Sequence, residues 1–184
     1  PRTAKEKSGE RKGNAGMKWA LIGYGGMGHW HVNKLSTMSE IEIAGIYDIL
    51  PDRRREAEEK GLRAYDSLEE LLADREVELV TIATPNDFHK PIAIQAMRAG
   101  KHVISEKPVA LSSDELQAMI DASREYGRVF SVHQNRRWDE DFLVMKRIYD
   151  ENRLGRVFNI ESRVHGSRGV PGDWRNRRLK GGGM

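Results

Sequence analysis

The chain has 184 residues, of which 38% are hydrophobic, and it carries no cysteine and a formal net charge of +3. This length fits one full domain with a remainder, and the missing thiols exclude disulfides, thiolate catalysis and thiolate metal sites. Residues 1–16 hold five basic and two acidic residues and residues 161–184 hold six and two, so residues 17–160 are net negative by four, which argues against a basic nucleic-acid-binding face.

The first 16 residues lack hydrophobic periodicity, whereas Met17 directly precedes a strand-like run, so residues 1–16 are interpreted as a flexible leader. The sequence has no run of about 18 apolar residues and no secretory signal pattern. We therefore expect a cytoplasmic protein that binds neither nucleic acid nor membrane and holds no metal.

Short β-branched runs alternate with helical patterns from Met17 to about residue 137. Strands are expected at 18–22, 41–48, near Ala64, at 78–84, 102–105 and 128–133. Helices are expected at 26–38, 52–60, from Ser67 onward, at 91–100 and at 112–127. This alternation predicts an α/β fold, a doubly wound parallel sheet of the Rossmann type, over residues 17–137.

The sequence beyond residue 137 predicts a helix over 138–152 and a strand over 157–164. One helix and one strand cannot bury a core by themselves, because an isolated strand leaves both edges unpaired. Residues 138–184 are therefore predicted to begin a second, incomplete α/β domain that binds substrate or forms an oligomer.

A glycine pattern, GYGGMG, follows the first strand and opens the first helix. Gly23 suits a tight turn, Gly25 lets the backbone approach a diphosphate, and Gly28 allows close packing of helix and strand. The predicted diphosphate-binding residues are Gly23, Tyr24, Gly25, Gly26, Met27 and Gly28. A turn that arises by chance is the alternative interpretation.

Asp48 ends the second strand, 20 residues after Gly28, where a carboxylate can accept hydrogen bonds from the adenosine ribose. The alternative is that Asp48 caps the helix that begins near Pro51. An acid at this place favours NAD as the cofactor over NADP. NADP stays possible because the arginines at 53–55 could hold its 2′-phosphate, although such a run is also typical of a solvated helix face.

Polar residues follow three later strands at the edge where an open parallel sheet binds ligands. Thr84, Pro85 and Asn86 follow one strand, Glu106, Lys107 and Pro108 the next, and residues 133–137 the last. A lysine at this edge, beside a nicotinamide, can exchange a proton with a substrate hydroxyl if burial and a neighbouring cation lower its pKa. The alternative is a surface pair of Lys107 with Glu106, which is awkward because adjacent residues point to opposite faces.

Five segments together resemble the glucose-fructose oxidoreductase and inositol dehydrogenase (Gfo/Idh/MocA) family of NAD(P)-dependent oxidoreductases: GYGGMG, IYD, ATPNDFH, AGKHVISEKPVA and HQNRRW. The resemblance implies that Lys107 is catalytic and that the bond to Pro108 is cis. It also implies that Asn86, Glu106 and Asn135 line the nicotinamide and its ribose. His89 is expected to order its loop rather than to perform chemistry.

The segments HQNRRWDEDF and GDWRNRRLKGGGM look most like family members that act on inositols and related cyclic polyols. By this resemblance Arg136, Arg137 and Trp138 lie at the mouth of the substrate site, or they bridge the two domains. Family members continue past a glycine run such as 181–183 to an aspartate and a histidine that complete the active site. The resemblance also implies a homo-oligomer when the protein is full length.

The expected activity is hydride transfer between nicotinamide and a secondary alcohol of a sugar or inositol-like polyol. Glycoside hydrolysis through transient oxidation, which uses NAD on the same scaffold, is one alternative. A non-catalytic NAD(P)-binding module is the other.

Overall fold

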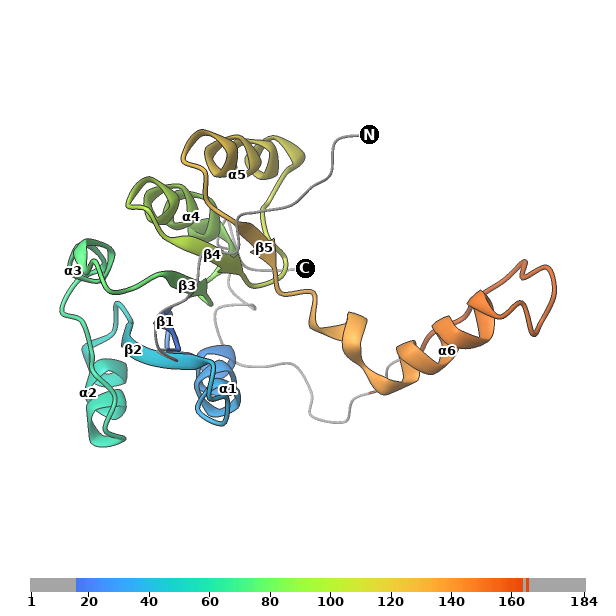
Figure 1. The fold of residues 1–184 in the computed structure, drawn as a ribbon, viewed down its shortest axis with the longest axis horizontal. Helices are drawn as coiled ribbons and strands as arrows, with labels where there is room; N and C mark the ends of the chain where they lie inside the picture. Colours follow the sequence, from blue (N-terminus) through green and yellow to red (C-terminus); the bar gives the residue numbers. More distant parts are fainter. Residues whose placement is uncertain (1–15, 164, 166–184) are drawn as a thin grey trace, which may run out of the picture. The chain divides into compact units, whose positions relative to one another are not determined.

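The computed structural model describes residues 16–163 and 165, and Figure 1 draws them in colour. The chain forms two compact units, divided after Val80. The strands are β1 (Met17–Ile22), β2 (Ile41–Tyr47), β3 (Leu79–Ile82), β4 (His102–Ser105) and β5 (Phe130–Val132), in the sheet order β2-β1-β3-β4-β5. The α-helices are α1 (Gly26–Leu35), α2 (Pro51–Glu59), α3 (Leu68–Ala73), α4 (His89–Arg98), α5 (Ser113–Glu125) and α6 (Glu140–Asp150), and the 3-10 helices are η1 (Asn86–Phe88) and η2 (Asn135–Trp138).

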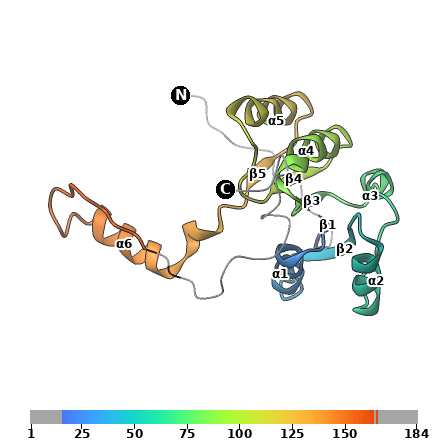
Figure 2. The same cartoon turned by 180° about the vertical axis from the view of Figure 1, so that it is seen from behind.

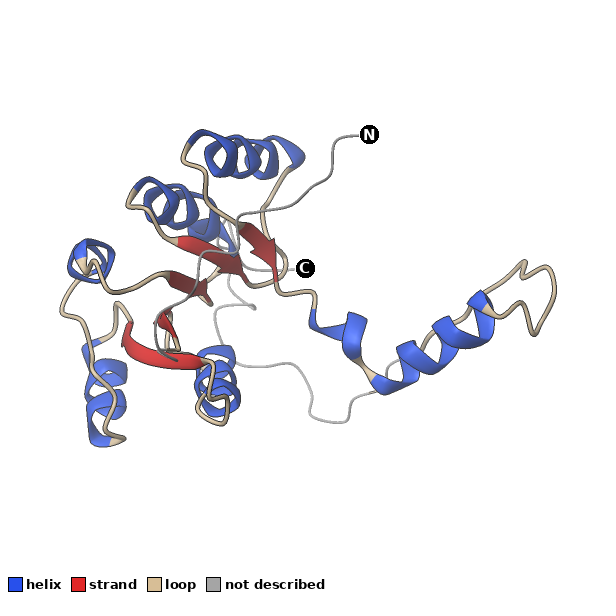
Figure 3. Cartoon of the chain, in the orientation of Figure 1, coloured by secondary structure: helices blue, strands red, loops and turns tan. Residues whose placement is uncertain are grey.

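The alternation of strands and helices in Figure 3 confirms the predicted α/β class with a parallel sheet. Two predicted strands are wrong. The one near Ala64 is reduced to a single parallel bridge with Ile46. The one at 157–164 is absent over 157–163, because no strand of the described chain pairs with it there. Most of the predicted leader lies outside the described residues, as do residue 164 and residues 166–184.

In the unit before the division, β1 and β2 pair in parallel, with a register shift between Trp19 and Ala20. The helices α1, α2 and α3 all contact this pair (Figure 1). Trp19, Leu21 and Ile46 are fully buried between strands and helices. Burial of such side chains contributes roughly 1.5–3 kcal/mol each, which fixes the carboxyl ends of β1 and β2 side by side.

In the unit after the division, β4 and β5 pair in parallel. The helix α4 packs on β4 through its buried face, and α5 packs beside α4, as Figures 1 and 2 both show. Ser112 caps α5 by accepting a hydrogen bond from Glu115 N–H at 3.2 Å, and Glu115 in turn accepts from Leu111 N–H. A serine followed three residues later by a glutamate is the spacing typical of such a cap.

The helix α6 buries none of its residues, and within the described chain it contacts η2. Phe142 and Met145 lie on its exposed surface. None of the described helices combines the length and the apolar composition that crossing a bilayer requires.

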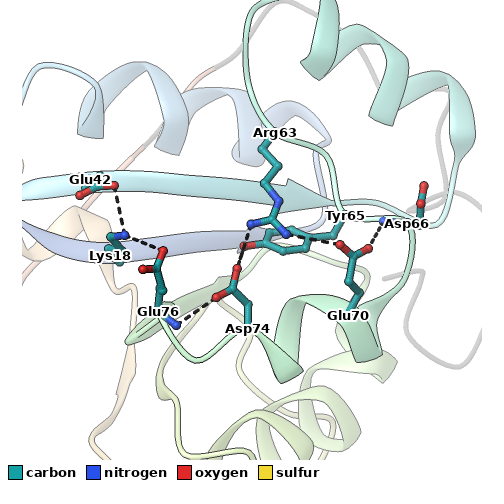
Figure 4. A network of polar contacts seen from close by, with 8 residues as sticks. All are labelled: Lys18, Glu42, Arg63, Tyr65, Asp66, Glu70, Asp74 and Glu76. Carbon is teal, nitrogen blue, oxygen red and sulfur yellow. Dashed lines mark hydrogen bonds and ion pairs between the residues drawn. The ribbon is translucent and has the colours of Figure 1, made fainter.

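A network of hydrogen bonds and ion pairs joins the segment before α3 to the segment after it (Figure 4). Asp74 accepts hydrogen bonds from the Tyr65 hydroxyl and the Arg63 guanidinium, both at 2.9 Å, and from Glu76 N–H at 3.0 Å. Burial alone raises the pKa of Asp74, but these hydrogen bonds outweigh it and hold the pKa below its ordinary value. Burial, together with Asp74, raises the pKa of Tyr65. The ionised carboxylate is therefore the form that the fold stabilises.

Replacing Asp74 with alanine is expected to lower the free energy of unfolding by about 1–3 kcal/mol, because the buried Tyr65 hydroxyl loses its acceptor. The contribution of the ionised Asp74 carboxylate to the free energy of unfolding is complete above its ordinary pKa of about 3.9. It is lost as the pH falls through the lower pKa that Asp74 has in the folded state. Urea unfolding at pH 7 and in acid measures both effects.

Glu76→Ala is the matched control, because Glu76 pairs with Lys18 on the surface and its loss is expected to cost less than about 1 kcal/mol. The claim that the ionised Asp74 carboxylate stabilises the fold is contradicted by either of two results. One is equal destabilisation by the two substitutions, and the other is a difference in unfolding free energy between them that does not become smaller in acid.

Candidate functional site

The predicted site residues fall into two groups, one before and one after the division at Val80. In the first group the chain turns sharply between β1 and α1, and Gly23 has a φ of +98°, which favours glycine. A Cβ atom on Gly28 would lie 2.3 Å from Gly23 O and 3.0 Å from the Leu21 side chain. The structure therefore shows the turn and the close packing that the glycine pattern predicts.

The helix α1 begins at Gly26, and its first turn holds no acidic residue. The first N–H groups of a helix have no acceptor within it, and the helix dipole places positive potential there. This end of α1 is suited to a phosphate group, and the small residues Gly25 and Gly26 leave the backbone accessible to it.

Asp48 is tied directly to the glycine turn. Its carboxylate accepts hydrogen bonds from Tyr24 N–H at 2.7 Å, Leu50 N–H at 2.9 Å and Arg53 Nη1 at 3.1 Å. The residue is 4% exposed. Asp48 thus holds the turn before α2 through Leu50 N–H and does not cap that helix directly. Through Tyr24 N–H it also joins the ends of β1 and β2 into one polar site.

A second contact joins the first turn of α1 to α2, and the sequence did not predict it. The ring nitrogens of His29 lie 2.8 Å from Gly25 O and 3.0 Å from Glu56 Oε1. Hydrogen bonds from Lys60 and from His29 lower the pKa of Glu56, and the same Glu56 raises the pKa of Lys60. The Tyr24 ring stacks on His29 with ring centroids 4.1 Å apart, and Tyr24 is buried, so any contact of Tyr24 with a ligand would involve its backbone.

In the second group, His89 joins two of the predicted loops. Its ring nitrogens lie 2.9 Å from Thr84 O and 3.0 Å from Pro108 O, and it is fully buried. Thr84, Pro85 and Asn86 follow β3, and all three are half-buried. The imidazole thereby fixes the loop after β3 to the loop after β4, which is the ordering role expected of it.

Glu106 and Lys107 point in different directions, as their adjacency predicts. Glu106 is 4% exposed, and its Oε1 lies 2.8 Å from Nδ1 of His133, whereas Lys107 is exposed. The surface pair of Lys107 with Glu106 therefore does not form. The burial that we expected around the amine is not provided by the described residues. The Lys107–Pro108 bond is cis.

His133 is a site residue that the sequence analysis placed at the end of the last strand without giving it a role. Ser105 and Val132 are register partners in the parallel pair β4–β5, so Glu106 and His133, which follow them, come side by side. Each of the two residues directly follows the last residue of its strand, and this shared position in the sequence could have predicted the pair.

The remaining predicted residues lie on η2. Asn135 is half-buried, while Arg136, Arg137 and Trp138 are exposed, and Trp138 is 78% exposed. Arg136 pairs with Asp139 at 3.0 Å on the same short segment. A substrate contact for these side chains stays a prediction.

A model of an oxidoreductase family with an NAD-binding Rossmann fold matches residues 17–134. The match covers both groups of candidate residues except Asn135 and those that follow it. The glycine turn, Asp48 and the loops after β3 and β4 thus lie within a region shared by NAD-binding proteins.

Individual proteins extend this similarity. An NAD-binding protein of known structure from Listeria innocua is 49% identical with a TM-score of 0.88, and the match covers 92% of this chain and 50% of that one. The NADP(+) scyllo-inositol 2-dehydrogenase of Bacillus subtilis is 34% identical over 75% of this chain and 38% of that protein. An inositol 2-dehydrogenase of Salmonella typhimurium is 29% identical over 84% of this chain and 48% of that protein. The chain spans half or less of the length of these proteins.

Replacing Gly28 with alanine is expected to lower the free energy of unfolding by at least about 2 kcal/mol, because the new methyl group would overlap Gly23 O. The shift of the turn needed to relieve this overlap is also expected to weaken the binding of NADH. Urea unfolding and a fluorescence titration with NADH measure the two effects.

Gly26→Ala is the control, because nothing lies within 4 Å of a Cβ atom there and the residue is helical. Its stability is expected to stay unchanged or to rise by up to about 1 kcal/mol. If Gly28→Ala is tolerated as well as Gly26→Ala, the close packing of α1 against the turn is refuted.

Proposed function

The chain belongs to the oxidoreductase family with an NAD-binding Rossmann fold that includes glucose-fructose oxidoreductase and inositol dehydrogenase, and from this premise we propose that the whole protein is an NAD(P)-dependent dehydrogenase. It transfers a hydride between nicotinamide and a secondary alcohol of a sugar or cyclitol. The similarity to two inositol 2-dehydrogenases supports this substrate class. The observation that carries the proposal is the exposed amine of Lys107, which directly follows a buried glutamate at the carboxyl end of β4.

The residues after the carboxyl ends of the strands would hold the cofactor, because open parallel sheets bind ligands there. The first turn of α1 holds the diphosphate through its N–H groups, and Asp48 accepts hydrogen bonds from the adenosine ribose. Thr84, Pro85 and Asn86 line the passage toward the nicotinamide, with His89 fixing their loop. Glu106 and Asn135 contact the nicotinamide ribose.

The bound nicotinamide supplies the carbon that accepts or donates the hydride. Lys107 takes the proton of the substrate hydroxyl as the hydride leaves the carbon, and it returns a proton in the reverse direction. Glu106 holds the backbone at this point, because its Oε2 accepts a hydrogen bond from Lys107 N–H at 3.3 Å. His133 fixes the other carboxylate oxygen, so the residue that precedes the amine cannot turn outward.

Arg136, Arg137 and Trp138 provide contacts to the substrate hydroxyls from η2. Their exposure leaves them accessible to a ligand or to the rest of the whole protein. We further propose that the full-length protein is a homo-oligomer.

In the full-length protein, Lys107→Gln is expected to lower kcat with a polyol substrate by roughly 10²–10⁴-fold, because the proton loses its acceptor. The affinity for NADH is expected to change by less than about threefold, since the diphosphate and adenosine contacts remain. Initial rates with a panel of inositols and sugars, and a fluorescence titration with NADH, give the two values.

Lys90→Gln is the matched control, because Lys90 is a partly exposed lysine on α4 paired at 3.9 Å with Glu115. It is expected to leave both values unchanged. Release of an aglycone from a glycoside without net NADH formation would show that the protein is a glycoside hydrolase and not a dehydrogenase. NADH binding without turnover of any polyol or glycoside would show that the protein is a non-catalytic NAD(P)-binding module.

A further inference from the structure

His29, in the first turn of α1, has an oxygen acceptor beside each of its ring nitrogens. Its Nδ1 lies 2.8 Å from Gly25 O, and its Nε2 lies 3.0 Å from Glu56 Oε1. A backbone carbonyl can only accept a hydrogen bond, so Nδ1 carries a proton. An ionised carboxylate can also only accept, so Nε2 carries a second proton wherever Glu56 is ionised. The geometry therefore fits the imidazolium cation, because either neutral form turns a nitrogen lone pair toward an oxygen.

Glu56 is held in its ionised form by two donors. Its Oε1 also accepts a hydrogen bond from Lys60 Nζ at 2.7 Å. The hydrogen bonds from Lys60 and from His29 keep the pKa of Glu56 below its ordinary value. Lys60 Nζ lies 5.7 Å from the centroid of the Tyr24 ring as well. Two cations thus share one carboxylate, and this cluster has a net positive charge when His29 is protonated and none when His29 is neutral.

The other titratable and charged groups at this turn leave that balance unchanged. The buried Tyr24 ring stacks on the His29 ring with centroids 4.1 Å apart, and the face of an aromatic ring attracts a cation. Arg53 Nη1 would lie 3.3 Å from a Cβ atom on Gly25, but its charge is paired with Asp48 at 3.1 Å. Among these groups, histidine is the type whose charge changes between about pH 5 and 8. The protonation of His29 therefore sets the charge of the turn.

The His29 ring also fixes a backbone donor of the proposed diphosphate site. Gly25 O accepts both from the His29 backbone N–H, at 2.9 Å, and from the ring. Because a trans peptide is planar, a fixed Gly25 carbonyl also fixes the direction of the Gly26 N–H, which has no acceptor within the helix. The helix dipole disfavours a cation in the first turn, so the charge of His29 gains from an anion bound at this end. With 30% of its side chain exposed, His29 exchanges protons with solvent.

We propose that His29 is a positioning residue of the diphosphate site and that its imidazolium form couples dinucleotide binding to the uptake of a proton. This assignment rests on the proposed dinucleotide site and deepens it by adding a regulation by pH. The protonated ring holds the Gly25 peptide and adds a positive charge near the bound diphosphate. The neutral ring loses this charge and its hydrogen bond to Glu56. Binding is therefore tighter at the pH values where His29 is protonated, and by reciprocity a bound dinucleotide favours the protonated ring.

The test is a calorimetric titration of the full-length protein with NADH between about pH 6 and 8.5. NADH is the probe because it lacks a phosphate monoester, whose second proton titrates near about pH 6 and would add its own pH dependence. The wild-type dissociation constant is expected to rise roughly two- to tenfold over this range, as one charge near a helix end predicts. Titrations in two buffers of different ionisation enthalpy are expected to show a net uptake of protons on binding.

Two variants separate the charge of the ring from its shape. His29→Gln keeps an N–H donor without a charge, so it is expected to bind NADH with little dependence on pH, without proton uptake, and no more tightly than the wild type at the alkaline end. His29→Lys keeps a positive charge throughout the range, so it is expected to bind more tightly than His29→Gln, also with little dependence on pH.

His102→Gln is the matched control, because His102 belongs to the unit after the division and its Nδ1 accepts a hydrogen bond from Val129 N–H at 2.9 Å. It is expected to keep the pH dependence of the wild type.

Three results overturn the assignment. The first is a wild-type dissociation constant that does not change with pH. The second is the same pH dependence in His29→Gln, because another group then takes up the proton. The third is an equal loss of affinity in His29→Gln and His29→Lys, because the charge then has no effect. Absence of NADH binding at every pH overturns the proposed function itself, and with it this assignment.

Discussion

The hydrogen bond from Tyr24 N–H to the Asp48 carboxylate is the interaction on which the adenosine half of the proposed dinucleotide site depends. It joins the turn after β1 to the end of β2 at 2.7 Å, and both Tyr24 and Asp48 are almost inaccessible to solvent. The close approach of Gly28 to Gly23 then fixes α1 against the same turn. Arg53 Nη1 donates to the same carboxylate, so α2 is also tied to this turn.

A related constraint acts on the loop that carries Lys107, the residue proposed to be catalytic. The parallel register of β4 and β5 brings Glu106 beside His133, and this buried contact directs the following residue, Lys107, outward. His89 fixes the same loop from the other side through Pro108 O. The Lys107 side chain is therefore exposed while the residues on either side of its loop are held by buried polar contacts.

Local sequence signals predicted the elements that have clear boundaries. The strand at 102–105 is flanked by Gly100 and by the Glu106–Pro108 segment, and its predicted bounds are correct. The run at 157–164 alternates apolar and polar residues, but no strand of the described chain pairs with its residues 157–163. Alternation alone cannot supply the hydrogen bonds that a strand needs. The pairs Glu106–His133 and His29–Glu56 depend on register and on helix packing, which no short window of sequence contains. Exposure of Lys107 likewise depends on neighbours distant in the chain.

The most direct test of the central claim is a crystal structure of the full-length protein grown with saturating NADH. The account predicts that the diphosphate lies against the first turn of α1, that the adenosine ribose contacts Asp48, and that the nicotinamide ring lies beside the Lys107 amine. A nucleotide bound away from the strand ends, or a nicotinamide ring that the Lys107 amine does not reach, would contradict it.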